Sequence, residues 1–165
     1  MKFEHYVKRV EESPEFKDFK KEHKKAYLCA GFFVLDFDKG KNMHQIDYFI
    51  PNSKKIATFT LNGETQLKIS EPAKKIEKKL EKIEGEAKTD LDALKGIVHD
   101  EMLNRTVTQN VIKIVAVLQS KEGKKIWYLS CVTNDFGIIT VHVDDESEDV
   151  LIFEKHSFFD FIRKV

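Results

Sequence analysis

Hydrophobic and polar positions repeat with a helical period at the start of the chain. Phe3, Val7 and Val10 are separated by charged residues at helical spacing, which predicts an amphipathic helix. The dipeptide Ser13-Pro14 then interrupts this helix, because serine favours the N-cap and proline the first helical turn. A second short helix is therefore expected to run to about His23.

Strand patterns with a period of two follow these helices. Residues 26–37 are hydrophobic at both parities, so both faces of this strand are expected to be covered. Asn62-Gly63, between two later patterns, is a strong signal for a tight hairpin turn. Short turns between consecutive strands predict an antiparallel meander. Its four strands are expected at residues 26–37, 43–50, 55–61 and 65–70.

Charged residues dominate the middle of the chain. A helix is predicted from Pro72 to Lys88, where Ile76, Leu80 and Ile83 form a narrow hydrophobic stripe among lysines and glutamates. The next helix is expected to have Thr89 as its N-cap. The hydrophobic stripe of that helix consists of Leu91, Leu94, Val98 and Met102.

A second series of four strand patterns occupies the C-terminal part. Trp127 and Cys131 fall on one face of its second strand, which indicates burial, whereas His142 falls on the outward face of the third. Five acidic residues within 144–149 are expected to form a solvated turn that does not meet these side chains. Ser157 is expected to cap a terminal helix. The four strands are predicted at residues 110–120, 125–132, 138–143 and 150–154.

The order of these elements suggests an internal duplication. Several residues 83 positions apart are identical, for example Val34 and Val117, and Gly40 and Gly123. Convergent patterning of two meanders is the alternative explanation. In either case the expected fold class is α+β, with two α-plus-four-stranded antiparallel meander units that each lay a helix on one face of a curled sheet.

The pattern divides the chain into three segments. Residues 1–71 form the N-terminal helical region and four-strand meander, and residues 72–88 form a connecting charged helix. Residues 89–165 form a helix, the second meander and a C-terminal helix. The first strand of each meander is hydrophobic on both faces, so packing of both halves as a single domain is an open alternative.

The C-terminal half resembles the PepSY domain, a small cystatin-like fold. The resemblance rests on the stretches "GKKIWYL" and "GIITVHVDDESEDVL", although Glu148 stands where the family has a glycine. It covers about Leu91 to Glu154 and reaches the N-terminal half only through the repeat. It implies a cystatin-like architecture and an extracytoplasmic role in binding or inhibiting peptidases. The matching residues are Gly123, Lys124, Trp127, Tyr128, Val141, Val143, Asp144, Ser147, Val150 and Leu151.

Composition narrows the classes of function. The 165 residues include 28 basic and 28 acidic side chains, so no overall field favours nucleic acid or an anionic membrane. The N-terminus is too charged for a signal peptide, and no hydrophobic run approaches the roughly 18 residues of a membrane span. We therefore expect a cytoplasmic protein without a membrane partner, unless a leader has been removed. Thirteen phenylalanines indicate a ring-rich core or an exposed aromatic surface.

Catalytic, cofactor and metal motifs do not emerge from the sequence. Cys29 and Cys131 lie in hydrophobic strands, which favours buried reduced thiols over a disulfide or a nucleophile. The six histidines form no metal motif, and the acidic turn lacks the spacing of an EF-hand loop. Phosphate-binding and nucleophile-elbow motifs are also absent. We expect no cofactor and no metal, and favour a protein that is not an enzyme.

The leading functional hypothesis is a non-catalytic binding or regulatory module. It would recognise a protein, peptide or small ligand through a face or an edge of a sheet. Formation of a homodimer is an open alternative. The aromatic surplus and the lack of a convergent catalytic set support this interpretation. The expected contact surface consists of Trp127, Tyr128, Tyr48, Phe49 and His142.

Two other classes of function remain open. The first is a nucleic-acid-associated protein that uses lysines of the first helix and of Lys74–Lys88 beside exposed rings. The second is an enzyme with an apolar cavity and one carboxylate or imidazole, such as Asp47 or His44. These two residues fall on opposite parities of one strand, which argues against a shared site.

Overall fold

The computed structural model describes residues 1–71 and 80–157. Within these ranges, eight strands form one antiparallel sheet. In chain order they are β1 (Tyr27–Asp36), β2 (Met43–Ile50), β3 (Lys55–Thr60), β4 (Gln66–Ser70), β5 (Val111–Lys121), β6 (Lys124–Thr133), β7 (Ile138–Asp144) and β8 (Val150–His156). The predicted α+β class and its antiparallel strands are confirmed, and every expected strand is present.

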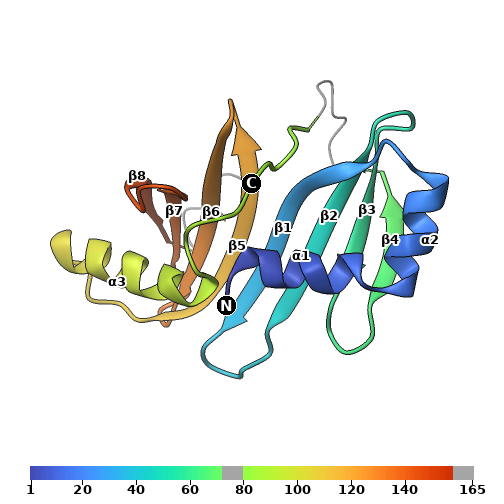
Figure 1. The fold of residues 1–165 in the computed structure, drawn as a ribbon. Helices are drawn as coiled ribbons and strands as arrows, with labels where there is room; N and C mark the ends of the chain where they lie inside the picture. Colours follow the sequence, from blue (N-terminus) through green and yellow to red (C-terminus); the bar gives the residue numbers. More distant parts are fainter. Residues whose placement is uncertain (72–79, 158–165) are drawn as a thin grey trace.

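The strand order is β4-β3-β2-β1-β5-β6-β7-β8 (Figure 1). Each half of the chain contributes four consecutive strands, and the halves join where β1 pairs antiparallel with β5. In this central pairing Phe33 lies opposite Ala116 and Val34 lies opposite Val115. One continuous sheet therefore connects residues from both halves.

Helices lie on one side of this sheet (Figure 1). α1 (Phe3–Glu11) and α2 (Pro14–Glu22) pack on the N-terminal half. A 3-10 turn, η1 (Leu91–Ala93), leads into α3 (Leu94–Asn104), which packs on the C-terminal half. Ser13 caps α2 as predicted, since its Oγ accepts a hydrogen bond of 3.2 Å from the Phe16 N–H.

The main core lies between the sheet and the helices. Phe33 of β1 and Trp127 of β6 are fully buried there, with ring centroids 6.1 Å apart. Phe3 of α1 packs edge-on against Phe33, at a centroid distance of 6.2 Å. The hydrophobic stripe predicted for the helix after Thr89 faces the same core, because all four of its members are buried. They are Leu91, Leu94, Val98 and Met102. The two halves thus share one core.

Gly31 of β1 allows α1 to approach the sheet closely. A Cβ atom at this position would lie 2.5 Å from Cε2 of Phe3 and 2.8 Å from Cε2 of Phe33. We expect Gly31→Ala to lower the free energy of unfolding by about 1–3 kcal/mol through overpacking, measured by urea denaturation. Gly96→Ala is the control, because a Cβ atom there meets no neighbour and should stabilise α3 by about 0.5–1 kcal/mol. Equal stability of Gly31→Ala and the wild type would contradict close packing.

The connection between the two meanders departs from the prediction. Residues 72–79 of the expected helix lie outside the described residues, and residues 80–88 are not helical. Leu80 packs on the side of the sheet without helices, whereas Ile83 enters the main core. The segment then passes the start of β6 on its way to α3 (Figure 1). The prediction of a helix was therefore wrong for residues 80–88.

Tertiary hydrogen bonds explain why this segment is not a helix. The Ile83 N–H donates to the Leu28 carbonyl at 2.9 Å, in place of a helical partner. The Glu81 carboxylate accepts the backbone N–H groups of Glu122 and Gly123 at 2.7 and 3.2 Å. Gly85 has a φ of +71°, which breaks a right-handed helix. Contacts with distant strands thus replace the local helical pattern.

Two further expectations concern helix ends. The N-cap before α3 is Asp90 and not Thr89, because an Asp90 carboxylate oxygen accepts the Asp92 N–H at 2.9 Å. The Thr89 hydroxyl instead donates to the Asp145 carbonyl at 2.8 Å. The terminal helix expected after Ser157 falls on residues 158–165, outside the described residues.

Candidate functional site

The side of the sheet opposite the helices, here called the open face, carries a row of uncharged side chains. Strand register aligns them across β1, β5, β6, β7 and β8, because residues that pair directly point to the same face. We call this set the central row. Its members, in order across the sheet, are Phe32, Val117, Tyr128, His142 and Ile152.

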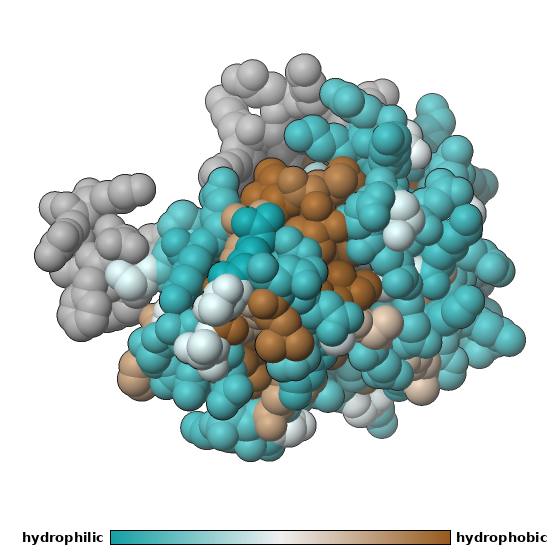
Figure 2. Space-filling view, turned by 90° about the vertical axis from the view of Figure 1, so that its left-hand side faces the viewer, coloured by the Kyte–Doolittle hydropathy of each residue, from teal (hydrophilic) through white to brown (hydrophobic). Residues whose placement is uncertain are grey.

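The central row is accessible from outside. Ile152 is 39% exposed and the other four side chains are half-buried. A second row beside it continues the mainly uncharged surface with Val34, Val115, Ser130 and Thr140. No helix within residues 1–71 and 80–157 covers this face. Viewed from the β8 side, hydrophobic residues gather in a patch bordered by hydrophilic ones (Figure 2).

Tyr128 and His142 form the polar centre of the row. Their rings meet edge to face, with centroids 4.6 Å apart. Burial lowers the pKa of His142, Glu154 partly opposes this change, and Lys121 adds to it. The imidazole is therefore neutral at neutral pH and can both donate and accept a hydrogen bond. A partner on this face would meet apolar surface with one adaptable polar group.

The structure separates the five residues expected to form a contact surface. Tyr128 and His142 lie on the open face, as the alternation predicted for His142. Trp127 and Tyr48 are buried in the main core, and Phe49 is buried in a small cluster with Cys29 and Ala30. Only the first two are thus available to a partner. Phe32, Val117 and Ile152 were missed. The strands that carry Phe32 and Val117 are hydrophobic at both parities, so the pattern predicted covered faces and did not indicate an outward position.

The acidic turn between β7 and β8 is not entirely solvated. Asp145 is only 1% exposed, and its carboxylate accepts three N–H groups. These donors are the backbone of Lys88 at 2.8 Å, the backbone of Thr89 at 3.0 Å and Nε1 of Trp127 at 2.9 Å. The expectation that the tryptophan and the acids do not meet was therefore wrong for Asp145. A buried indole N–H needs an acceptor, which was the available signal.

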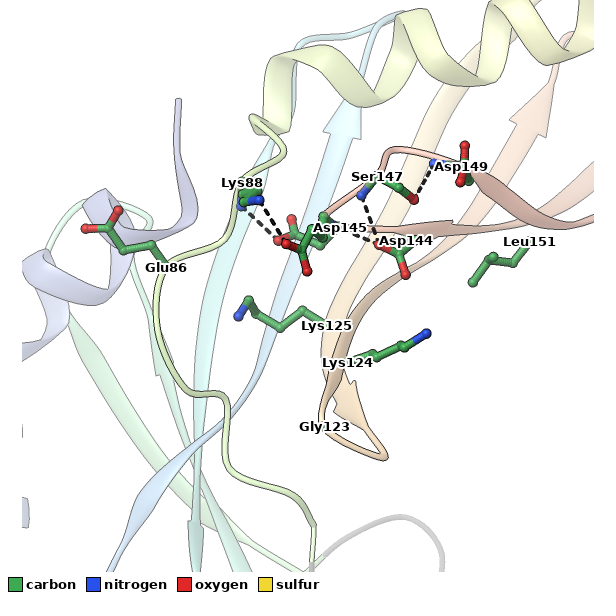
Figure 3. Close-up of a pocket in the computed structure, with 11 residues that line it drawn as sticks. Glu86, Lys88, Gly123, Lys124, Lys125, Asp144, Asp145, Ser147, Asp149 and Leu151 are labelled. Carbon is green, nitrogen blue, oxygen red and sulfur yellow. Dashed lines mark hydrogen bonds and ion pairs between the residues drawn. The ribbon is translucent and has the colours of Figure 1, made fainter.

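A shallow pocket of about 580 Å³ lies over this turn (Figure 3). Most of its polar groups already have partners within the protein. Lys88 pairs with Glu146 at 3.0 Å, and Lys125 Nζ donates to the Glu84 carbonyl at 2.8 Å. The backbone N–H of Ser147 holds the pKa of Asp144 below its usual value. The groups that line this pocket therefore form a structural junction between the turn and the segment before α3.

Groups considered for catalysis do not converge. Cys29 and Cys131 are both free and buried, and burial raises the pKa of both thiols, that of Cys131 to about 12. Neither thiol is a nucleophile at neutral pH. His44 stacks on Tyr6 on the helix side, with centroids 4.7 Å apart, whereas Asp47 points to the open face. The two residues named as alternatives for an enzyme site thus lie on opposite sides of the sheet.

The described part of the chain contains neither a metal-ligand cluster nor a helix that could span a membrane. Within it, no group of three or more histidine, cysteine, aspartate or glutamate side chains is placed to hold a metal ion. None of the helices found there is both long and hydrophobic enough to cross a bilayer.

Comparisons with known proteins bear on the fold. No protein-family model and no curated protein matches the chain. A solved structure from Clostridium difficile 630, described as a "putative lipoprotein", is similar with a TM-score of 0.58 and 14% sequence identity. The match covers 86% of this chain and 90% of the other. At this identity the likeness shows a shared fold alone, so the chain shares its α+β architecture with that lipoprotein structure.

Proposed function

We propose that the protein is a non-catalytic binding module that recognises a protein or peptide partner through the open face. The central row carries this proposal. On an antiparallel sheet with one side in solvent, the side chains that point to the solvent are normally polar. Here Phe32, Val117, Tyr128 and Ile152 instead bring rings and aliphatic groups to the open face. Contiguous apolar surface of this kind is typical of an interaction site.

The shape and chemistry of the open face favour a macromolecular partner. Five neighbouring strands span roughly 19 Å at the usual strand spacing, which suits a peptide or protein surface better than a small molecule. Polar side chains flank the apolar centre, including Gln45, Ser130 and Glu154. An aromatic centre with a polar rim is the usual composition of a protein interface.

Peptide selection and NMR mapping test this proposal. We expect peptides selected from a random display library to shift the amide resonances of the central row. Tyr128→Ala should weaken their binding by about tenfold or more, because tyrosine is the largest side chain of the row and a frequent anchor of interfaces. Leu103→Ala is the matched control, since Leu103 is 62% exposed on α3 and should leave affinity unchanged.

Several outcomes would overturn the proposal. One is failure to select any peptide, and another is selection of peptides that bind Tyr128→Ala as tightly as the wild type. Shifts confined to the edge strand β4 would assign a different surface. Self-association through the open face, seen by light scattering and abolished by Tyr128→Ala, would identify a second copy as the occupant. Denaturation curves confirm that each variant is folded.

We also propose that the two meanders are repeats of a cystatin- or PepSY-like α-plus-four-strand unit. Equivalent glycines support this proposal, because Gly40 and Gly123 both occupy turns with positive φ, +68° and +80°. The central pairing joins Phe33 to Ala116, two residues separated by the repeat offset. A twofold rotation at this pair should superpose β1–β4 on β5–β8 in a crystal structure. A clear mismatch would contradict a duplication.

A further inference from the structure

The turn between β6 and β7 presents a phenylalanine to solvent. Phe136 is 75% exposed, and no other large hydrophobic side chain within residues 1–71 and 80–157 is as exposed. Its φ is +62°, in the left-handed region. This conformation is uncommon for a bulky residue, whereas glycine and asparagine adopt it readily. The stability of the turn therefore does not explain a phenylalanine at this position.

Hydrogen bonds hold the turn in one conformation. The carbonyl of buried Thr133 accepts a hydrogen bond from the Phe136 N–H at 3.1 Å. The hydroxyl of the same residue accepts one from the Gly137 N–H at 2.9 Å. Its own N–H donates to the Gly137 carbonyl at 2.9 Å. The Asn134 N–H donates to the Asn110 carbonyl at 2.9 Å, which ties the turn to the segment before β5. The ring is thus presented by a preorganised backbone, which reduces the entropy lost on binding.

A carboxylate stands next to the exposed ring in sequence. Asp135 is exposed and accepts the Thr133 hydroxyl at 2.5 Å, and this hydrogen bond lowers the pKa of Asp135. The tip of this turn, Asp135 and Phe136, therefore combines one apolar ring with one anion. An anionic lipid surface would repel this carboxylate, whereas a protein pocket with a basic rim would attract it. Charge complementarity thus favours a protein partner.

We propose that Phe136 is the anchor of a second interaction surface and inserts into an apolar pocket of a partner protein. An arginine or lysine on the rim of that pocket would pair with Asp135. Aromatic side chains that enter a pocket contribute much of the affinity of protein interfaces. The exposure and backbone conformation of Phe136 carry this inference, so it stands independently of the open face.

Substitution of Phe136 separates the effect of its ring on stability from the effect of the ring on binding. Phe136→Gly should raise the midpoint of thermal unfolding, because glycine removes the left-handed strain and the exposed ring. A lower midpoint would show that the ring stabilises the fold and would overturn the inference. Leu103→Ala is the control for loss of an exposed hydrophobic side chain without a change in φ.

Site-specific cross-linking tests the partner. The full chain with Phe136→p-benzoylphenylalanine is irradiated in an extract of its source cells, beside Leu103→p-benzoylphenylalanine. Each protein that cross-links at position 136 but not at position 103 is then purified. Its affinity is measured by titration with chains that lack the cross-linking residue. We expect Phe136→Gly to weaken binding about 30-fold and Leu103→Ala to leave it unchanged. Asp135→Asn, which retains the acceptor for Thr133, should weaken binding less and reduce its dependence on salt.

Three results would overturn the inference. The first is no capture at 136 above the control position, and the second is equal affinity of Phe136→Gly and the wild type. The third is sedimentation with phosphatidylserine vesicles that is lost in Phe136→Gly, which would assign the tip to a lipid surface.

Discussion

Replacing Asp145 with alanine should lower the free energy of unfolding by about 3–5 kcal/mol, because it breaks a buried hydrogen-bond network. The substitution leaves three N–H donors without their acceptor, from Lys88, Thr89 and Trp127. Trp127 is fully buried, so its indole N–H is not exposed to solvent in the wild type. Guanidinium unfolding followed by fluorescence measures the loss, and the single tryptophan reports directly on this region.

Neighbouring substitutions show whether the loss comes from these hydrogen bonds. Glu146→Ala in the same turn is the control, because its side chain is 80% exposed and its surface ion pair contributes at most about 1 kcal/mol. Trp127→Phe removes one donor and should cost about 1–2 kcal/mol, with an energetic coupling to Asp145 in a double-mutant cycle. A loss below about 1 kcal/mol in Asp145→Ala would contradict the role assigned to this carboxylate.

Replacing Asp47 with asparagine should stabilise the protein at pH values above 6. Asp47 projects from β2 onto the open face, and its Oδ1 is buried without a hydrogen-bond partner. Burial raises its pKa from 3.8 to about 6, an effect that Thr58 partly opposes. Such a shift corresponds to about 3 kcal/mol between the two protonation states. Asparagine has a similar shape and carries no charge, so it avoids this cost.

The pH dependence of the Asp47→Asn effect follows from the sign of the shift. The folded state of the wild type binds the proton more tightly than the unfolded state does. The resulting stability is fully present below pH 3.8 and is lost as the pH rises through about 6. The stability difference between variant and wild type should therefore grow by up to about 3 kcal/mol across this interval. Denaturation at several pH values measures it, and an NMR titration midpoint of Asp47 near 4 would contradict it.

Local alternation was sufficient to predict the strands but not every connection. The eight strands appear because apolar side chains recur on one face and turn residues separate them. The segment 80–88 has an equally regular pattern, yet Glu81 and Ile83 bond to distant strands. Its helix was predicted from the spacing of Ile76, Leu80 and Ile83, which reports local preference and not tertiary partners. Long-range hydrogen bonds thus determined the conformation of residues 80–88, where the prediction was wrong.

The candidate sites were predictable only in part, for a related reason. Parity correctly separated Trp127 from His142, because side chains in one strand alternate between faces. Alignment of Phe32 with Val117 requires the register of β1 against β5, which depends on contacts between distant segments. The inward turn of Asp145 also depends on Lys88 and Thr89, far away in the chain.

The central pairing of β1 with β5 has a consequence for synthesis of the chain. The N-terminal meander is complete after Ser70, but β5 begins only at Val111. During translation β1 therefore keeps one edge without a partner until the later strand has left the ribosome. Unpaired edges of this kind can pair with other chains. The junction that unites the complete sheet is thus also an edge at which a nascent chain can aggregate.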